Sequence, residues 1–180
     1  MFRAQVRENV CLQLLEERHA VEVFSLIDRE RAYLREWLPW VDSTECLDDT
    51  LSFIRSSLEQ FASNKGFACG IWRAQEFCGV IGTAKLDMLN RKGEIGYWLG
   101  RSYQGQGIMT AACRAVVTHM LNEMGLNRVT IHCAQGNDKS CAVAQRLGFT
   151  EEGPAREAQL LHGQFRDLRR FAMLKKDWQP

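Results

Sequence analysis

Apolar residues follow two spacings along this chain, and the two spacings predict strands and helices. Alternating or continuous apolar runs of strand length predict strands at about residues 6–15, 66–73, 77–86, 94–99, 128–134, 150–161 and 165–175. Apolar residues three and four apart predict helices that start near residue 17 and then cover about 33–38, 46–62, 105–123 and 139–147, with Gly125 as a C-terminal glycine. In chain order this reads β-α-α-α-β-β-β-α-β-α-β-β. The order predicts a mixed α/β fold in which an antiparallel meander leads into a parallel crossover.

The segment at residues 94–109, EIGYWLGRSYQGQGIM, carries the clearest chemical signal. A strand leads through a short turn into Gln104-Gly105-Gln106-Gly107, which we expect to open the following helix. The first-turn N–H groups of a helix have no partners within the helix and the helix dipole is positive there, so such a terminus binds phosphate. Glycine lets the backbone approach an anion without a Cβ in the way.

Three kinds of phosphate loop compete for this segment. A nucleoside triphosphate loop requires Lys followed by Ser or Thr after its last glycine, and neither pair follows Gly107. A dinucleotide loop requires a third glycine where Thr110 stands. The third kind, Q-x-x-G-x-(G/A), is the pyrophosphate loop of acyl-CoA-dependent N-acetyltransferases. Gln104, Gly107 and Met109 occupy its positions, with Met in place of the usual small residue, and the rest of the chain has to decide.

The composition is that of a globular protein without a strong charge bias. Hydrophobic residues make up 46% of the 180 residues and charged residues 25%, and the formal net charge is +1. We therefore expect one domain over residues 1–180 with no nucleic-acid or membrane partner, since no apolar run approaches the about 20 residues of a membrane span. The first ten residues contain no signal-peptide core, and the seven cysteines form no C-x-x-C motif. These features predict a cytoplasmic protein with reduced thiols and no metal site.

Three further motifs extend the pattern over nearly the whole chain. Residues 137–149 read NDKSCAVAQRLGF, residues 152–178 contain E-G-x-x-R, then Gly, Asp and Trp, and residues 31–40 read RAYLREWLPW. With the glycine segment, they resemble the GNAT-superfamily acetyltransferases of the RimJ/RimL type, which acetylate ribosomal-protein N-termini. The resemblance implies the GNAT acyl-CoA N-acyltransferase fold, a mixed central sheet with a splayed pair of parallel strands, flanked by helices. It also implies acetyl-CoA as co-substrate, direct transfer to a primary amine with a ribosomal-protein N-terminal α-amine as the favoured acceptor, and a homodimer.

The resemblance also implies a cofactor-binding set around the glycine segment. The pantetheine arm would lie between the strands at residues 94–99 and 128–134, paired with exposed backbone groups like an added strand. A backbone N–H near the end of the first of these strands would polarise the thioester carbonyl, and the loop N–H groups would hold the pyrophosphate. The implied cofactor-binding residues are Trp98, Leu99, Gln104, Gly105, Gln106, Gly107, Ile108, Met109 and Asn137.

Two residues are candidates for proton transfer. An amine must be neutral to attack, and an α-amino group, with a reference pKa of about 7.7–8.0, needs only a modest base. Glu94 is the candidate base, because it begins the strand that would hold the thioester and relatives place a catalytic Glu at a matching site; a solvated carboxylate is an equal alternative. Ser140 could protonate the departing thiolate, act with Asn137 as a helix cap, or do both. Many superfamily members carry a tyrosine acid where Ala144 stands, which transfers the acid role to Ser140.

Other residues leave two interpretations each. Trp37 and Trp40 could line the acceptor slot or pack in the core. His119, His132 and Cys133 are more simply explained as structural residues. Two other functions also stay open. One is acetylation of a small amine such as a polyamine, an amino acid or an aminoglycoside, and the other is a CoA-binding module without catalysis.

Overall fold

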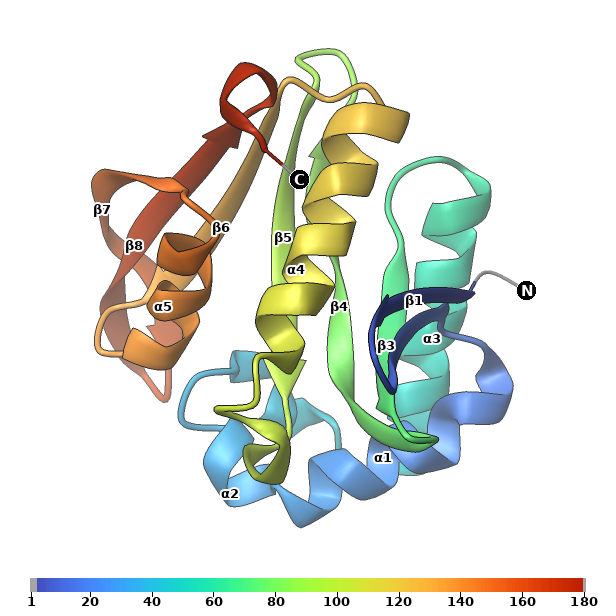
Figure 1. Ribbon diagram of the computed structural model, residues 1–180. Coiled ribbons are helices and arrows are strands. Elements are labelled where there is room, and N and C mark those ends of the chain that lie inside the picture. Colours follow the sequence, from blue (N-terminus) through green and yellow to red (C-terminus); the bar gives the residue numbers. More distant parts are fainter. Residues whose placement is uncertain (1–2, 180) are drawn as a thin grey trace. The chain divides into compact units, whose positions relative to one another are not determined.

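The helices and strands of the chain group into two compact units. The structure, a computed structural model, describes residues 3–179 (Figure 1). Unit 1 comprises Met1–Gly82 with Tyr97–Ile108, and unit 2 comprises Thr83–Gly96 with Met109–Pro180. The strands are hydrogen-bonded in the order β1-β2-β3-β4-β5-β6-β8-β7, and β4 and β5 each contribute residues to both units. Within the described part of the chain, no helix combines the length and the apolar character needed to cross a membrane.

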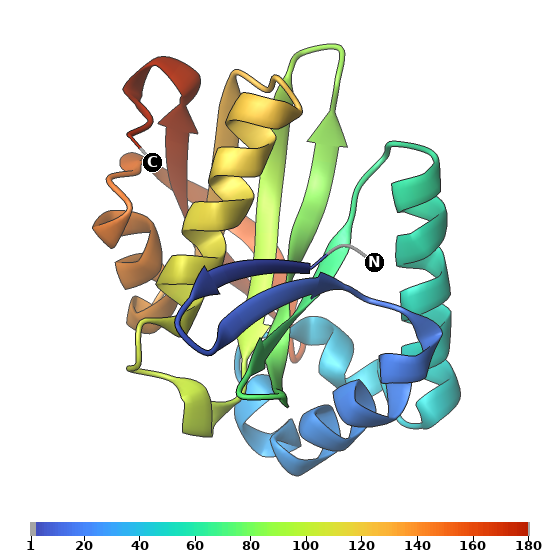
Figure 2. The same ribbon diagram turned by 45° about the vertical axis from the view of Figure 1, so that its right-hand side comes forward.

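Unit 1 combines antiparallel strands with three helices. Its elements are β1 (Arg3–Arg7), β2 (Val10–Leu14), α1 (Ala20–Arg29), α2 (Arg31–Leu34), α3 (Leu47–Ala62), β3 (Ala68–Arg73), the first part of β4 (Glu76–Asp87) and the end of β5 (Lys92–Leu99). Strand β2 pairs with β1 and β3, and β3 pairs with β4, all antiparallel; the β1–β2 hairpin is dark blue in Figure 2. Helices α1 and α3 lie against each other and bury an apolar core that includes Leu15, Val23, Val41 and Ile54.

Two segments of unit 1 differ from the predicted elements. The predicted strand at 6–15 is a hairpin of β1 and β2, because Asn9 has φ 58 and turns the chain between them. Asparagine tolerates this left-handed conformation better than most residues. The predicted helix at 33–38 is shorter, since α2 ends at Leu34. Leu38 is extended, with φ −117 and ψ 107, as expected for a residue before proline, and the 3-10 turn Pro39–Ser43 follows.

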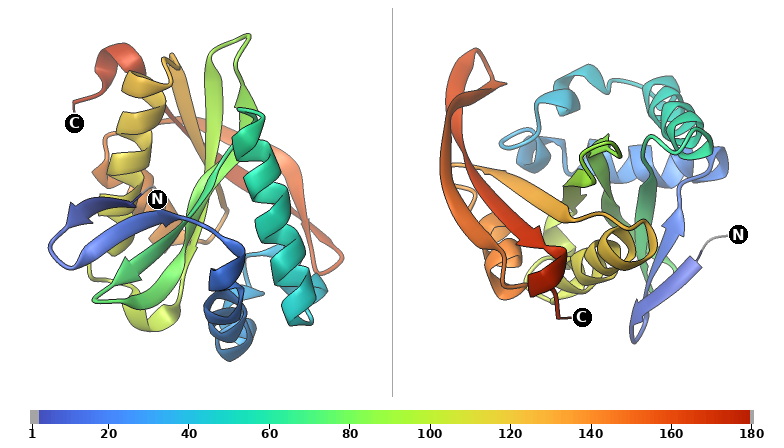
Figure 3. Two further views of the ribbon diagram at one scale, coloured as in Figure 1. Left: turned by 90° about the vertical axis from the view of Figure 1, so that its right-hand side faces the viewer. Right: turned by 90° about the horizontal axis from the view of Figure 1, so that it is seen from above.

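Unit 2 builds a parallel crossover and a long hairpin. Its elements are the end of β4, the first part of β5, α4 (Ile108–Thr118), the π-helical turn His119–Glu123, β6 (Arg128–Ala134), α5 (Asp138–Arg146), β7 (Thr150–Leu161) and β8 (Gln164–Leu174). Strand β6 pairs parallel with β5 and antiparallel with β8, and β7 completes the hairpin with β8, orange to red in Figure 3. Helix α5 lies against β6. The core includes Val117, Met120, Leu126, Val129, Ile131 and Phe171.

The long helix begins later than the sequence predicts. Helix α4 starts at Ile108, not near Gly105. Gly105 and Gly107 have φ of +70 and +74, a left-handed conformation that a right-handed helix excludes. At the other end, Gly125 has φ +72 and lies just beyond the π-helical turn, which confirms the predicted C-terminal glycine. The two loop glycines therefore form a separate turn that leads into the helix.

Candidate functional site

The glycine loop at residues 104–107 is held by two arginines of unit 1. Nη1 of Arg7, on β1, donates to the carbonyl oxygen of Gln106 at 2.7 Å. Nη1 of Arg73, on β3, donates to the side-chain oxygen of Gln106 at 2.6 Å, and the amide of Gln106 donates to the carbonyl of Ser102 at 2.9 Å. In a trans peptide the carbonyl and the next N–H point in opposite directions. Arg7 therefore fixes the Gln106 carbonyl on its own side and turns the N–H of Gly107 away from it.

Gln104 connects this loop to the end of β5 and to α2. Its side-chain nitrogen donates to the hydroxyl of Tyr33 at 2.7 Å and to the carbonyl of Leu99 at 3.2 Å. The guanidinium of Arg101 lies over the Tyr33 ring, 5.8 Å from its centroid. The side-chain amide of Gln104 is thus engaged within unit 1, and its backbone N–H donates to the carbonyl of Arg101 at 3.3 Å.

Trp98, on β5, lies among aromatic side chains of unit 1. Its ring centroid is 6.0 Å from that of Trp40 and 6.0 Å from that of Phe77. A Cβ at Gly79 of β4 would overlap the Trp98 carbonyl, so the two strand backbones approach closely there. Trp40 therefore packs against the aromatic group at the end of β5, whereas Trp37 is half-buried.

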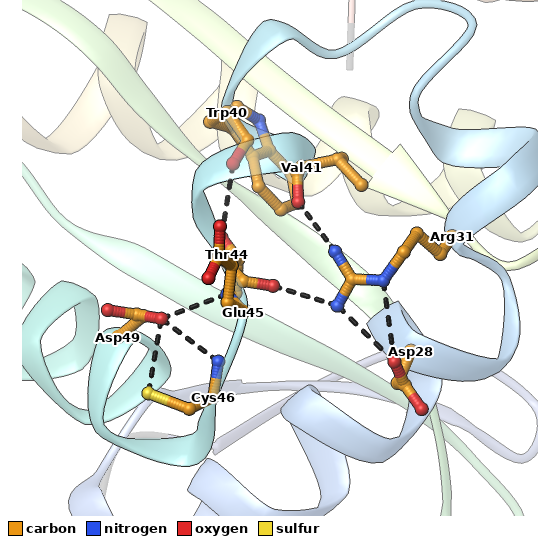
Figure 4. A network of polar contacts seen from close by, with 8 residues as sticks. All are labelled: Asp28, Arg31, Trp40, Val41, Thr44, Glu45, Cys46 and Asp49. Carbon is orange, nitrogen blue, oxygen red and sulfur yellow. Dashed lines mark hydrogen bonds and ion pairs between the residues drawn. The ribbon is translucent and has the colours of Figure 1, made fainter.

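A polar network holds the turn that carries Trp40 (Figure 4). The guanidinium of Arg31 donates to the carbonyls of Val41 at 2.7 Å and Thr44 at 2.8 Å, and it also contacts Asp28. The Thr44 hydroxyl donates to the Trp40 carbonyl at 3.2 Å. The side chain of Arg31, a residue of the 31–40 motif, thus holds the turn Pro39–Ser43 through backbone carbonyl groups.

The same network continues to the start of α3. A carboxylate oxygen of Asp49 accepts from the backbone N–H groups of Glu45 and Cys46, both at 2.9 Å. These hydrogen bonds lower the pKa of the Asp49 carboxyl, and the one from the backbone N–H of Cys46 has the largest effect. Asp49 thereby caps the helix and completes the support of the preceding turn.

In unit 2, Glu94 of β5 forms a pair with His132 of β6. Oε1 of Glu94 lies 3.4 Å from Nδ1 of His132, and the two side chains are 19% and 26% exposed. The interaction with His132 lowers the pKa of the Glu94 carboxyl, against partial burial, which raises it; the charge of Lys85 lowers it further. Glu94 is thus a largely buried carboxylate next to an imidazole and not a solvated one.

Ser140 and Asn137 lie at the start of α5 and have the predicted capping geometry. The side chain of Asn137 accepts from the backbone N–H of Ser140 at 3.2 Å. The hydroxyl of Ser140 lies 3.2 Å from the sulfur of Cys133 on β6. Burial raises the pKa of the Cys133 thiol to about 12, so this thiol is neutral near pH 7. The cap leaves the Ser140 hydroxyl at the strand, in contact with a neutral group.

Comparisons with known proteins decide the family. A sequence profile of the acetyltransferase (GNAT) domain matches residues 9–150. The chain belongs to the GNAT acetyltransferase family. It is 38% identical to YdaF of Bacillus subtilis, over 99% of this chain and 98% of that protein. It is 32% identical to the ribosomal-protein-serine acetyltransferase of Escherichia coli, over 94% of this chain and 95% of that protein.

A solved structure agrees with this family. RimL, the ribosomal L7/L12 α-N-protein acetyltransferase crystallised with coenzyme A, matches with a TM-score of 0.93 and 28% identity, over 96% of this chain and 98% of that chain. The predicted family and the predicted mixed α/β GNAT fold are therefore confirmed. As a GNAT protein the chain is an acyltransferase of the N-acetyltransferase class.

Most of the predicted site residues of this GNAT protein lie in three groups, one in unit 1 and two in unit 2. Unit 1 contains the loop and the Trp98–Leu99 end of β5, joined through Gln104. Unit 2 contains the Glu94–His132 pair and, separately, the Asn137–Ser140 cap. Ile108 and Met109 are buried, 2% and 7% exposed, so their side chains belong to the core and their backbone N–H groups are what the helix start offers. This burial accounts for a large residue at Met109.

Sequence reasoning missed the two arginines that hold the loop. Arg7 and Arg73 lie far from Gln106 in the chain, and both are exposed strand residues of ordinary appearance. His132 was noted from the sequence but assigned to a structural role, since its pairing with Glu94 depends on the register of β5 with β6.

Proposed function

We propose that this GNAT protein transfers the acetyl group of acetyl-CoA to the N-terminal α-amine of a protein, in the first place a ribosomal protein. The observation that carries the proposal is the similarity to the E. coli ribosomal-protein-serine acetyltransferase, which extends over 94% of this chain and 95% of that protein. A ribosomal acceptor implies that the protein acts in the cytoplasm. The homodimer expected from the resemblance and the single domain over residues 1–180 are separate proposals; sedimentation tests the first and cooperative unfolding the second.

The glycine loop of unit 1 is the proposed site of the CoA pyrophosphate. Gly105 and Gly107 adopt a left-handed conformation, and turns of this kind point backbone N–H groups toward an anion. Arg7 supports this arrangement by holding the Gln106 carbonyl away from the Gly107 N–H. The first N–H groups of α4 follow directly in the chain, so loop and helix start offer a continuous series of donors.

The end of β5 is the proposed support of the thioester. Its last residues, Trp98 and Leu99, are fixed by aromatic packing and by the hydrogen bond from Gln104. A backbone N–H held in this way can stabilise the oxyanion of a tetrahedral intermediate, a contribution of about 3–4 kcal/mol in other enzymes. The RimL structure with coenzyme A supports acetyl-CoA as the co-substrate.

Glu94 and Ser140 are the proposed proton-transfer residues, and Asn137 positions Ser140. The attacking amine must lose a proton, and the departing thiolate can accept a proton or a hydrogen bond. Glu94 lies in a half-buried pair with His132, and the Ser140 hydroxyl is held at the start of α5 by the cap. Glu94 thus belongs to the pair that would accept the amine proton, and Ser140 provides a hydroxyl that can donate to the thiolate.

An acceptor screen with mass detection tests the proposed function. The purified protein is incubated with acetyl-CoA and peptides that begin with Ser or Ala, each also prepared with a blocked N-terminus and an internal lysine. We expect one added acetyl group on the free peptides and none on the blocked ones. The matched blocked peptide is the control that separates an α-amine acceptor from a lysine acceptor.

Two outcomes would contradict the proposal. Acetylation of spermidine, amino acids or aminoglycosides without acetylation of any peptide would change the acceptor class. Calorimetric binding of acetyl-CoA without acetylation of any acceptor, including a ribosomal-protein extract, would indicate a CoA-binding module.

A further inference from the structure

The Glu94–His132 pair and the Ser140 hydroxyl lie on opposite faces of β6. From Arg128 to Cys133 of β6, the buried residues Val129, Ile131 and Cys133 alternate with half-buried ones, and the last residue, Ala134, is buried as well. Neighbouring residues of a strand point to opposite faces. Ser140 contacts Cys133 on the buried face, against which α5 lies. His132 therefore points to the other face.

The parallel register places Glu94 on the same face as His132. Glu94 is paired with Thr130, two residues before His132, and the side chains of paired residues share a face. The 3.4 Å separation of Oε1 of Glu94 from Nδ1 of His132 agrees with this placement. The pair therefore depends on the two strands being in this one register.

Charged groups surround the pair on this face of unit 2. Arg170 of β8 is directly opposite His132 in the antiparallel register. Glu152 of β7 is paired with Arg128, which lowers the pKa of the Glu152 carboxyl, and a positive charge on His132 would lower this pKa further. Lys85 of β4 adds a positive charge near Glu94. A proton on His132 is thus placed among charges of both signs, with Glu94 as its direct partner.

We infer that His132 accepts the proton of the acceptor amine through Nε2 and that Glu94 is the positioning residue that holds its ring. The inference rests on the proposed function and assigns its base. With Glu94 next to Nδ1, the imidazole places its proton on Nδ1 and presents the lone pair of Nε2, the arrangement that a carboxylate imposes on histidine bases. The pKa of the Glu94 carboxyl is lowered, first by the hydrogen bond with His132, so this carboxylate is a weak base by itself, whereas imidazole is the most common general base in enzymes.

The step balances in protons and electrons. The α-ammonium group gives one proton to Nε2 of His132, and the freed nitrogen lone pair forms the N–C bond to the acetyl carbonyl. The C–S bond breaks and its electron pair leaves on the CoA sulfur. After the N–C bond forms, the nitrogen still has to lose a second proton. This proton passes through solvent to the departing sulfur, so the products are the amide and the thiol of CoA. The imidazolium, stabilised by Glu94, returns its proton to solvent. Acceptance by His132 on one face and thiolate stabilisation by Ser140 on the other would keep the two ends of the reaction apart.

The pH dependence of His132→Gln tests this assignment. At pH 6.5 only about 5% of an α-amine is neutral in solution, whereas at pH 9 about 90% is neutral. We expect kcat/KM for a Ser-initiated peptide to fall at least about 100-fold at pH 6.5, as for the loss of a general base, and to come within about tenfold of wild type at pH 9. Glu94→Gln should give a smaller loss at pH 6.5. A merely structural role would lower activity equally at both pH values.

The chain offers a matched control in a second histidine–glutamate pair. Nδ1 of His119 lies 2.9 Å from Oε2 of Glu123 on the π-helical turn, and both side chains are exposed. His119→Gln should therefore keep the wild-type rate and pH profile. Binding of acetyl-CoA by His132→Gln, measured by calorimetry, should match wild type and show that the variant is folded; His132→Asn serves as a second variant if it is not.

The outcomes separate the inference from the proposed function. The inference is overturned if kcat/KM of His132→Gln at pH 6.5 is within about threefold of wild type, or if kcat/KM falls by the same factor at both pH values. In either case, acetylation of the peptide by the wild type still supports the proposed function. Absence of peptide acetylation by the wild type overturns both.

Discussion

Gly107→Ala tests the pyrophosphate loop, and Gly125→Ala is its matched control. The two glycines have nearly the same backbone, with φ of +74 and +72. An alanine held in this left-handed conformation costs about 1–2 kcal/mol. For a chain of this size that corresponds to a fall of roughly 2–8 °C in Tm, which we expect in both variants. The intrinsic conformational cost therefore cancels in the comparison.

The surroundings of the added methyl group distinguish the two sites. A Cβ at Gly107 would lie 3.0 Å from Nη1 of Arg7, whereas a Cβ at Gly125 meets no atom within 4 Å. Nη1 of Arg7 would have to shift by a few tenths of an ångström, which disturbs its hydrogen bond to the Gln106 carbonyl, and we expect the N–H of Gly107 to lose its fixed direction. A hydrogen bond to a charged group contributes about 1.5–3 kcal/mol. Loss of one N–H to phosphate therefore predicts a Kd for acetyl-CoA that is about 10- to 150-fold higher.

Isothermal titration calorimetry with acetyl-CoA, with thermal unfolding of the same samples, provides the measurement. Gly107→Ala should lose affinity as calculated, whereas Gly125→Ala should keep the wild-type Kd with a similar fall in Tm. A Gly107→Ala protein that binds acetyl-CoA within about threefold of wild type would refute the loop assignment. Equal loss of affinity in Gly125→Ala would show that the effect comes from general destabilisation.

Four further variants test the residues around the loop and the proton-transfer groups. Arg7→Ala removes the hydrogen bond to Gln106 and should raise the KM for acetyl-CoA about 2- to 10-fold with kcat nearly unchanged in steady-state assays. Ser140→Ala should lower kcat more than it raises the KM for acetyl-CoA, whereas Asn137→Ala, which removes the cap, should cost about 1 kcal/mol in the free energy of unfolding. The pKa of Glu94 is lowered in the folded protein, so the ionised carboxylate stabilises the fold. In urea unfolding, the difference in free energy of unfolding between wild type and Glu94→Gln should be fully present above about pH 4.5 and should disappear as the pH falls below it.

Local features of this chain were predictable from the sequence. The cap of α5 needs Asn137 and Ser140 three residues apart, and the end of the π-helical turn needs a glycine that can take a positive φ; both requirements are local. The conformation of the chain at both places follows from the chemistry of a few neighbouring residues. The same holds for most strands and helices, whose apolar spacing reflects the face that they bury.

The errors arose where short segments admit two backbone conformations. Residues 6–15 alternate well enough for one strand, and only the left-handed Asn9 turns them into a hairpin. Gly105 and Gly107 are compatible with a helix start or with a turn, and their positive φ values make them a turn. Spacing along the chain does not distinguish these cases, because the alternatives differ in dihedral angles and not in the pattern of buried residues.

The proposed base, His132, depends on a contact with Glu94, which is distant in the sequence. The register of β6 keeps the two side chains together. His132 and Cys133 are neighbours, yet one faces Glu94 and the other faces Ser140. A shift of β6 by one residue would exchange the two faces and place the imidazole in the core. Burial of Val129 and Ile131 at 0% and 1% exposure opposes such a shift, because it would expose both side chains. The buried residues of β6 thus determine which side chains face Glu94 and which face Ser140. The role of His132 depends on this register, so it cannot be assigned from the position of the histidine in the sequence alone.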